Sequence, residues 1–170
     1  MKSEKQGRVY ILAVLAMVIA VAADQVTKYL AVIYLKDKPP FVIWDQVFEL
    51  TYLENRGAAF GLLQNRTIFF VITACVVFAI VIFLYIKIPK TSKYLPLRLC
   101  GIFVFAGAAG NLIDRIRLGY VVDFFYFKLI DFPIFNVADI YVTVGFAVLV
   151  VLILFVYKEE ELACFTKKKR

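Results

Sequence analysis

Four long stretches of this sequence carry no charged side chain: residues 9–23, 68–86, 99–113 and 140–157. The second has 19 residues, or about 28 Å as a helix, which is enough to cross the hydrocarbon core of a bilayer. The chain is 63% hydrophobic with a mean hydropathy of +0.83, where a soluble domain is about 45–50% apolar. We therefore expect a mainly α integral membrane protein with four transmembrane helices, as a single membrane-embedded domain over residues 1–170. The predicted spans are residues 9–30, 68–86, 97–114 and 137–157.

The first stretch admits a second interpretation. It follows three basic residues and ends in Ala20-Val21-Ala22, a pattern typical of a cleaved secretory signal peptide. The helical pattern continues, however, through Asp24 and Lys28 to residue 35, and these two residues share a helix face at a spacing of four. We favour an anchored helix whose polar end enters a site.

Two segments connect the predicted spans, residues 36–67 and 116–134. Both contain residues that end helices and residues that favour strands. Pro39 and Pro40 end the first helix, because proline lacks an N–H and restricts its predecessor. Residues 41–43 and 47–53 are rich in β-branched and aromatic side chains. Phe48, Leu50 and Tyr52 alternate with Val47, Glu49 and Thr51, which predicts short strands. In the second connection Gly119 breaks the helix, and residues 121–125 have either an extended or an amphipathic pattern. Residues 124–134 are aromatic and predict a position at the lipid–water interface.

The charge distribution predicts the orientation. The two ends and residues 87–98 together hold 12 basic and 4 acidic residues, a net charge of +8. The polar segments on the other side hold 8 basic and 9 acidic residues, a net charge of −1. By the positive-inside rule both termini are cytoplasmic and both connections are extracytoplasmic. The total of +7 is then a topology signal, so we expect membrane lipids and no nucleic acid as partners.

Several catalytic classes are excluded or disfavoured by what the chain lacks. It has no histidine, which excludes a Ser-His-Asp triad and a histidine metal site. Cys75 and Cys100 lie in apolar stretches, Cys164 is in the tail, and no CxxC pair occurs. Carboxylates remain as the abundant acid–base groups.

The most polar stretch between two apolar ones is residues 111–139. Asp114, Asp123 and Asp139 fall where a predicted span meets its connection, and ionisable groups there are costly and usually functional. Asn111, Asp114 and Arg115 share a helix face, and Asn136 is placed to cap the fourth helix. We expect the working site here, at the extracytoplasmic membrane face.

Five short motifs make the chain resemble the lipoprotein signal peptidase family, also called signal peptidase II. They are DQVTK at 24–28, NRGAAF at 55–60, GNLIDR at 110–115, VVDF at 121–124 and FNVAD at 135–139. The resemblance covers residues 9–157 in the family's order and spacing. It implies a bacterial inner-membrane aspartyl endopeptidase with four spans, a small extracytoplasmic β-rich cradle and a short interfacial amphipathic helix. It also implies cleavage of diacylglyceryl-modified prolipoproteins just before the lipidated cysteine.

The resemblance assigns Asp123 and Asp139 as the catalytic dyad. It implies no cofactor and no metal, and we expect a monomer that meets its prolipoprotein substrate in the membrane. The residues expected to bind substrate or support the site share these motifs; they are Asp24, Lys28, Asn55, Gly57, Asn111, Asp114, Arg115 and Asn136.

Three alternatives stay open at the level of sequence. The first is a small proton- or cation-coupled transporter, although the spans carry no charge at mid-depth. The second is a Mg²⁺-dependent hydrolase that uses Asp114, Asp123 and Asp139 as ligands. The third is purely structural: Asp24 pairs with Lys28, and Asp114 pairs with a neighbouring arginine.

Overall fold

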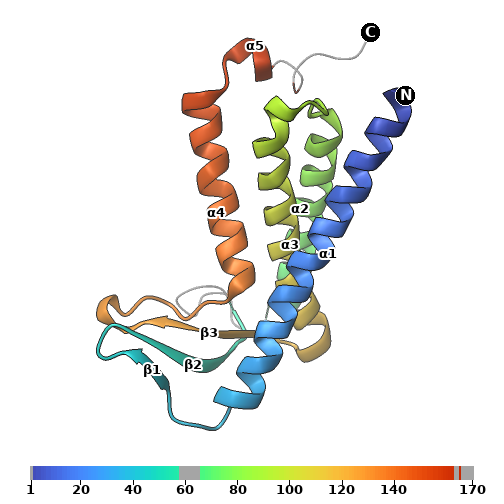
Figure 1. Ribbon diagram of the computed structural model, residues 1–170. Coiled ribbons are helices and arrows are strands. Elements are labelled where there is room, and N and C mark those ends of the chain that lie inside the picture. The colour runs from blue at the N-terminus through green and yellow to red at the C-terminus, as the bar shows by residue number, and fades with distance from the viewer. Residues whose placement is uncertain (1, 58–65, 163–164, 166–170) are drawn as a thin grey trace.

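The computed structural model describes residues 2–57, 66–162 and 165. Four of its helices are long and apolar enough to span a membrane, as the sequence predicts (Figure 1). They are α1 (Lys2–Leu35), α2 (Thr67–Lys87), α3 (Leu95–Leu118) and α4 (Val137–Val151), the last continuing as a π-helical segment, η4 (Leu152–Val156).

The helices end where local chemistry requires it. α1 stops before Asp37, which has a φ of 58°, and before the two prolines. Gly119 ends α3 in the left-handed conformation, with a φ of 79° that a residue without Cβ adopts at no steric cost. Asn136 caps α4, and its side chain accepts from the backbone N–H of Asp139.

A small antiparallel sheet has the strand order β1-β2-β3. Its strands are β1 (Phe41–Trp44), β2 (Phe48–Asn55) and β3 (Val121–Phe127). The two strands predicted between residues 41 and 53 are confirmed, and the segment left open at 121–125 is a strand. In the described part of the chain, helical pieces outside the four long helices are limited to η2 (Ser92–Tyr94), η3 (Lys128–Ile130) and α5 (Glu159–Leu162).

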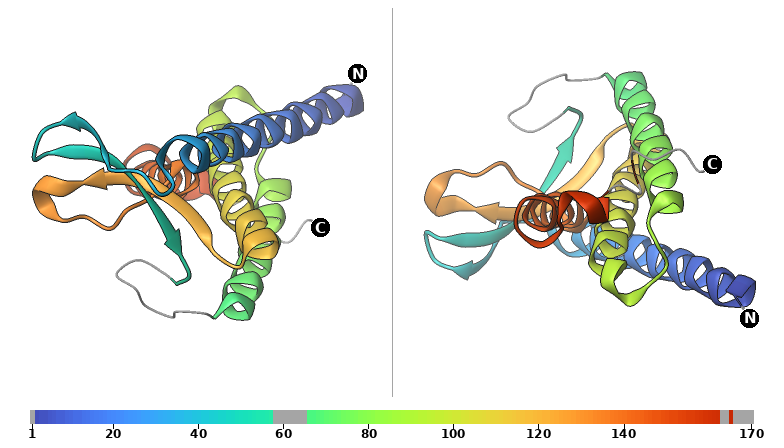
Figure 2. Two further views of the ribbon diagram at one scale, coloured as in Figure 1. Left: turned by 90° about the horizontal axis from the view of Figure 1, so that it is seen from below. Right: turned by 90° about the horizontal axis from the view of Figure 1, so that it is seen from above.

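The sheet covers one end of the helix bundle, and the start of α1 and the short helix α5 lie at the opposite end (Figure 1). Viewed along the bundle, α1 leans away from the other helices toward its N-terminus (Figure 2). β3 connects the end of α3 to the start of α4, so it brings Asp123 to the base of both helices.

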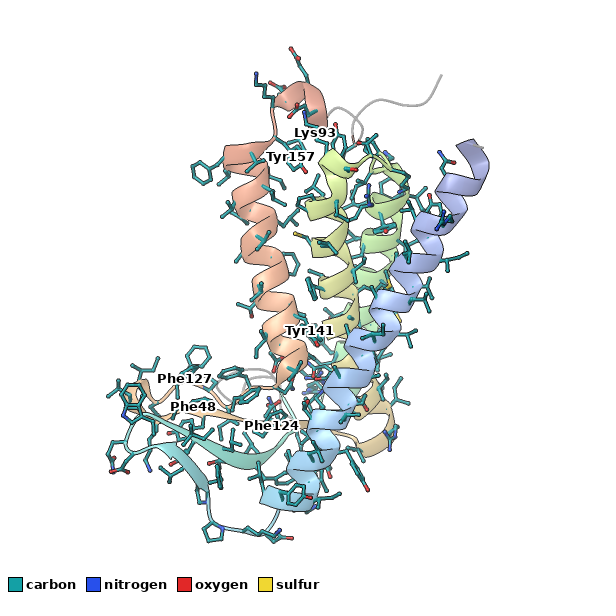
Figure 3. All side chains as sticks on the ribbon, in the orientation of Figure 1. Phe48, Lys93, Phe124, Phe127, Tyr141 and Tyr157 are labelled. Carbon is teal, nitrogen blue, oxygen red and sulfur yellow. The ribbon has the colours of Figure 1, made fainter. Side chains whose placement is uncertain are left out.

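Packing joins the sheet to the helices. A buried apolar cluster at this junction contains Ala31 and Leu35 of α1 and Val122 and Phe124 of β3. Phe124 is 5% exposed and packs inside the protein, whereas Leu129 and Ile130 of the same aromatic-rich segment are well exposed. The position of this segment at the lipid–water interface stays a prediction. Figure 3 shows Phe124 close to α1, with Phe48 and Phe127 further out on the sheet.

The small residues near the end of α3 allow close helix packing. A Cβ on Gly107 would lie 2.4 Å from the backbone oxygen of Ala138, so α3 and α4 approach too closely there for any side chain. This agrees with the expectation that small residues bring membrane helices together.

Candidate active site

A buried ammonium group organises the polar layer at the sheet end of the bundle. Lys28 Nζ lies 3.0 Å from Asp24 Oδ2, 3.0 Å from Asp114 Oδ2 and 2.9 Å from Asn111 Oδ1. Asp24, Lys28 and Asp114 are each no more than 3% exposed. Charges this deeply buried are tolerated only when they are paired and hydrogen-bonded. The predicted Asp24–Lys28 pair is therefore confirmed as part of a larger cluster.

The prediction that Asp114 pairs with an arginine is wrong, because its partner is Lys28. Adjacent Arg115 instead donates from Nη2 to the carbonyl of Gly57 at 3.1 Å, and its guanidinium lies over the ring of Phe70. The helix turn directs these neighbouring side chains apart, and the partner of Asp114 comes from α1, 86 positions earlier in the sequence.

Gln25 belongs to the DQVTK motif but is not among the site residues that the sequence predicts. Its side-chain amide donates to Asp24 Oδ2 at 3.2 Å, to Asp114 Oδ1 at 3.0 Å and to the carbonyl of Gly110 at 3.2 Å. Its position next to Asp24 was the one available signal.

The cluster also fixes the backbone that carries the dyad. Asp24 Oδ1 accepts from the N–H of Ala138 at 2.9 Å, which ties α1 to the first turn of α4. Asp114 Oδ2 accepts from the N–H of Val122 at 3.2 Å, one residue before Asp123. A Cβ on Gly110 would lie 2.4 Å from Asp24 Oδ2, so a glycine is required for α1 to approach.

Asp123 is 1% exposed and is held by amide side chains. Asn136 Nδ2 donates to its Oδ1 at 2.6 Å, and Asn55 Nδ2 donates to its Oδ2 at 2.9 Å. The same Asn136 amide group reaches Asn111 Oδ1 at 3.1 Å. Asn136 thus connects Asp123 to the layer around Lys28.

Asp139 is the third residue of α4 and completes a capping box with Asn136. Its Oδ2 accepts from the backbone N–H of Asn136 at 3.1 Å, and its own N–H donates to Asn136 Oδ1 at 3.0 Å. Asn111 Nδ2 donates to its other oxygen at 2.8 Å. Three elements, α3, β3 and α4, therefore position the two aspartates around one asparagine.

Asn55 ends β2 and orients the chain that follows. Its Oδ1 accepts from the N–H of Gly57 at 2.9 Å, while Arg115 binds the Gly57 carbonyl. Residues 58–60 of the same sequence motif lie outside the described residues. The predicted support residues Asn55, Gly57 and Arg115 are thus brought together at the edge of the dyad.

A cavity of about 550 Å³ opens beside both aspartates. Its walls are mainly apolar, with Phe132, Phe135 and Ile140 among them, and its polar groups come from the dyad and its neighbours. A concave, largely apolar site with a few converging polar groups is the usual form of a substrate pocket. The polar lining residues are Asn55, Asn111, Arg115, Asp123, Asp139 and Thr143.

Burial, reinforced by the charge of Asp139, raises the pKa of Asp123 from its usual 3.8 to about 7. The hydrogen bonds from Asn55 and Asn136 oppose this rise without cancelling it. A carboxyl group with this pKa is protonated in a large fraction of molecules at neutral pH. The site therefore offers one carboxylic acid next to a second carboxyl group, which suits acid–base catalysis.

The comparisons with known proteins identify the family. The family model described as Signal peptidase (SPase) II matches residues 16–155. The chain belongs to the signal peptidase II family. A protein named lipoprotein signal peptidase from Caldanaerobacter subterraneus subsp. tengcongensis is 46% identical over 85% of this chain and 97% of its own length. One of that name from Brevibacillus brevis is 50% identical over 77% of this chain and 87% of its own length.

Two solved structures of bacterial membrane enzymes have a similar fold. A bacterial membrane enzyme determined at 2.3 Å resolution is similar with a TM-score of 0.77 and 31% identity, covering 94% of this chain and 93% of the other. A second, at 1.9 Å, has a TM-score of 0.72 over 86% of this chain and 94% of the other. The chain is a multi-pass bacterial membrane peptidase, and the comparisons do not support the transporter alternative.

The magnesium alternative also lacks support in the geometry. Within residues 2–57, 66–162 and 165, no group of three acidic or cysteine side chains is arranged to hold a metal ion. Both oxygens of Asp114 already have protein partners: Oδ2 accepts from Lys28 and from the N–H of Val122, and Oδ1 accepts from Gln25.

Proposed function

We propose that this protein is an aspartic endopeptidase that removes the signal peptide from prolipoproteins, with Asp123 and Asp139 as its catalytic pair. The observation that carries the proposal is the sharing of Asn136 by both aspartates at the wall of one cavity. Family membership supports the cleavage of signal peptides. The choice of these two aspartates as catalytic groups is our inference from their surroundings.

The proposed mechanism uses one proton shared by the pair. Asp139 is the base, because hydrogen bonds from Asn111 and from the N-terminus of α4 stabilise its negative charge. It takes a proton from water, whose oxygen attacks the scissile carbonyl carbon. Asp123, whose pKa is raised, donates a hydrogen bond and then its proton to the carbonyl oxygen. The C–N bond breaks as Asp139 passes the proton that it took from water to the leaving amine. Asp123 takes back a proton from one hydroxyl of the intermediate, which leaves a carboxylic acid product and restores the starting protonation of the pair.

We further propose that the substrate carries a diacylglyceryl group and that cleavage occurs just before the lipidated cysteine. An apolar cavity wall next to the dyad is suited to a lipid-bearing peptide that stays partly in the bilayer. No cofactor or metal takes part in this scheme, and one chain holds both aspartates, so a monomer is sufficient.

The charge asymmetry supports an orientation with both termini in the cytoplasm and the sheet outside. Cysteine introduced at Lys38 or Lys128 is then expected to react with a membrane-impermeant thiol reagent in intact cells. Cysteine introduced at Lys158, at the other end of the bundle, is expected to react only after lysis. The parent chain, which has three cysteines of its own, gives the background. The reverse labelling pattern would reverse the proposed orientation.

The catalytic assignment is tested by Asp123→Asn and Asp139→Asn in the purified full chain with a lipid-modified prolipoprotein. Each amide is nearly isosteric but cannot carry the proton, so we expect a loss of about a hundredfold to ten-thousandfold in rate. Asp45→Asn is the matched control, because Asp45 is exposed in the turn between β1 and β2. Thermal unfolding checks that all three variants are folded. Activity in either dyad variant close to that of Asp45→Asn would refute the assignment.

A further inference from the structure

The cavity beside the dyad is the first of three that follow one another along α3. The second, of about 340 Å³, lies between α2, α3 and α4. The third, of about 470 Å³, continues with almost entirely apolar walls and shares Val77 with the second. The residues common to the first and second cavities are Phe70, Asn111, Arg115, Asp139 and Thr143.

These three cavities form one groove with helical walls. Phe70, Val77 and Leu84 line it from α2 at intervals of seven residues, which places them on one helix face. Asp139, Phe146 and Ile153 line the opposite wall at the same interval. α2 and α4 each pack on α3, which forms the floor (Figure 2). Small residues, Gly101 and Ala108, lie along this floor and leave space above it between α2 and α4.

We propose that this groove binds the apolar segment of the signal peptide as a helix, with α5 and Phe165 closing its far end. The proposal rests on the proposed function, because the groove begins at the dyad, where the signal peptide ends. Its floor from Asn111 to Leu97 is 14 residues, or about 21 Å. A signal peptide has an apolar segment of roughly 7–15 residues, and a helix of about 14 residues fills this length.

Leu162 of α5 and Phe165 lie at the far end of the groove. Phe165 lines the third cavity, and Leu162 and Phe165 pack against a buried apolar cluster that includes Leu97 and Leu152. Lys87 Nζ donates to the carbonyl of Phe165 at 3.0 Å.

An aromatic stack anchors α5. The rings of Tyr94 and Tyr157 stack with centroids 5.5 Å apart, and Tyr94 donates to the carbonyl of Glu161 at 3.0 Å. Tyr157 donates to the carbonyl of Lys93 at 2.7 Å, and Figure 3 shows both residues at the end opposite the sheet. α5 is therefore fixed at the position where an apolar helix in the groove has to stop.

The groove is tested by Val77→Trp, which fills the junction of the second and third cavities. Val76→Trp is the matched control, because Val76 is 52% exposed on the neighbouring face of α2. Each variant is assayed with a lipid-modified full precursor and with a lipid-modified peptide that lacks the apolar segment. We expect the ratio of kcat/KM for the precursor to that for the peptide to fall about tenfold in Val77→Trp, and not in Val76→Trp.

Equal ratios of kcat/KM in the two variants would overturn the inference and leave the proposed function intact. This is also the result expected if the groove holds only a lipid acyl chain. If the parent protein, without substitutions, cleaves no precursor, the proposed function is overturned and the inference with it.

The closed end is tested with a precursor whose apolar segment is longer by four leucines, which adds about 6 Å of helix. We expect kcat/KM to be about tenfold lower than for the native length. Phe165→Ala is expected to reduce this difference, and Phe155→Ala, which changes a residue that is 80% exposed, is not. The same length dependence in both variants would show that α5 and Phe165 do not limit the groove.

Discussion

Two pairs of aspartates lie in the same polar layer and are held in different ways. Asp24 and Asp114 share the ammonium group of Lys28, which neutralises part of their charge. Asp123 and Asp139 are held by the neutral amides of asparagines, and no ion pair in the described part of the chain includes them. The difference agrees with the proposed roles. Asp24 and Asp114 fix the architecture, whereas the proposed catalytic pair lacks a salt bridge that would keep both of its carboxylates ionised.

The first test of this difference between the two aspartate pairs is Lys28→Met. Removal of the ammonium group leaves two buried carboxylates without a cation, and losing one partner of a buried ion pair costs about 3–5 kcal/mol in free energy of unfolding. We expect the largest loss of thermal stability at this position. Lys36→Met is the control, because Lys36 pairs with Glu54 at the surface, where such a pair contributes about 0–1 kcal/mol. Equal effects of the two changes would contradict a structural role for the buried cluster.

A smaller effect is expected from Asp114→Asn, which removes one of the two carboxylates around Lys28. An unsatisfied or weakened buried hydrogen bond costs about 1–3 kcal/mol. We expect lower thermal stability, with cleavage per folded molecule reduced far less than by Asp123→Asn. Unfolding and cleavage are measured on the same preparation. A loss of cleavage as large as that of Asp123→Asn, without a loss of stability, would move Asp114 into the catalytic group.

The difference between the two aspartate pairs also predicts that the stability of the folded protein depends on pH. The pKa of Asp123 is raised in the folded protein to about 7 from 3.8, so the folded state binds this proton more tightly than the unfolded state does. The contribution of this group to stability is therefore full below pH about 4 and is lost as the pH rises to about 7. Unfolding temperatures measured across this range are expected to fall less in Asp123→Asn than in the parent. Identical slopes would contradict the raised pKa.

The smallest expected effect is that of a chelator. The proposed chemistry needs only water and the two carboxyl groups, so cleavage in excess EDTA is expected to match cleavage without it. If EDTA abolishes cleavage and added Mg²⁺ restores it, the metal-dependent alternative is supported. Asp114 of one pair would then bind the ion together with Asp123 and Asp139 of the other.

Much of the architecture is readable from the sequence because it depends on local chemistry. Stretches without charge predict the four long helices, and Gly119 and Asn136 mark where two of them end and begin. The sequence motifs also name both aspartates that line the cavity. Each of these features depends on neighbours within a few residues.

The remaining features depend on contacts between distant segments. The partner of Asp114 could not be predicted, since Arg115 is adjacent in sequence and Lys28 lies on another helix. Gln25 has no distinctive pattern, and its three acceptors come together only when α1 packs on α3. Phe124 belongs to an aromatic stretch, and only the position of β3 against α1 determines that it is buried.

The capping box at the start of α4 links the proposed catalytic cycle to the stability of the first turn of the helix. The oxygen of Asp139 that accepts from the N–H of Asn136 holds the first turn of the helix, and Asn136 also holds Asp123. In the proposed mechanism Asp139 takes a proton from water in each cycle, and its carboxyl group is then a weaker acceptor for the N–H of Asn136. The helix start is thus expected to flex once per catalytic cycle, in step with the chemistry. A substitution that stiffens this turn would therefore slow the enzyme even though it touches no substrate.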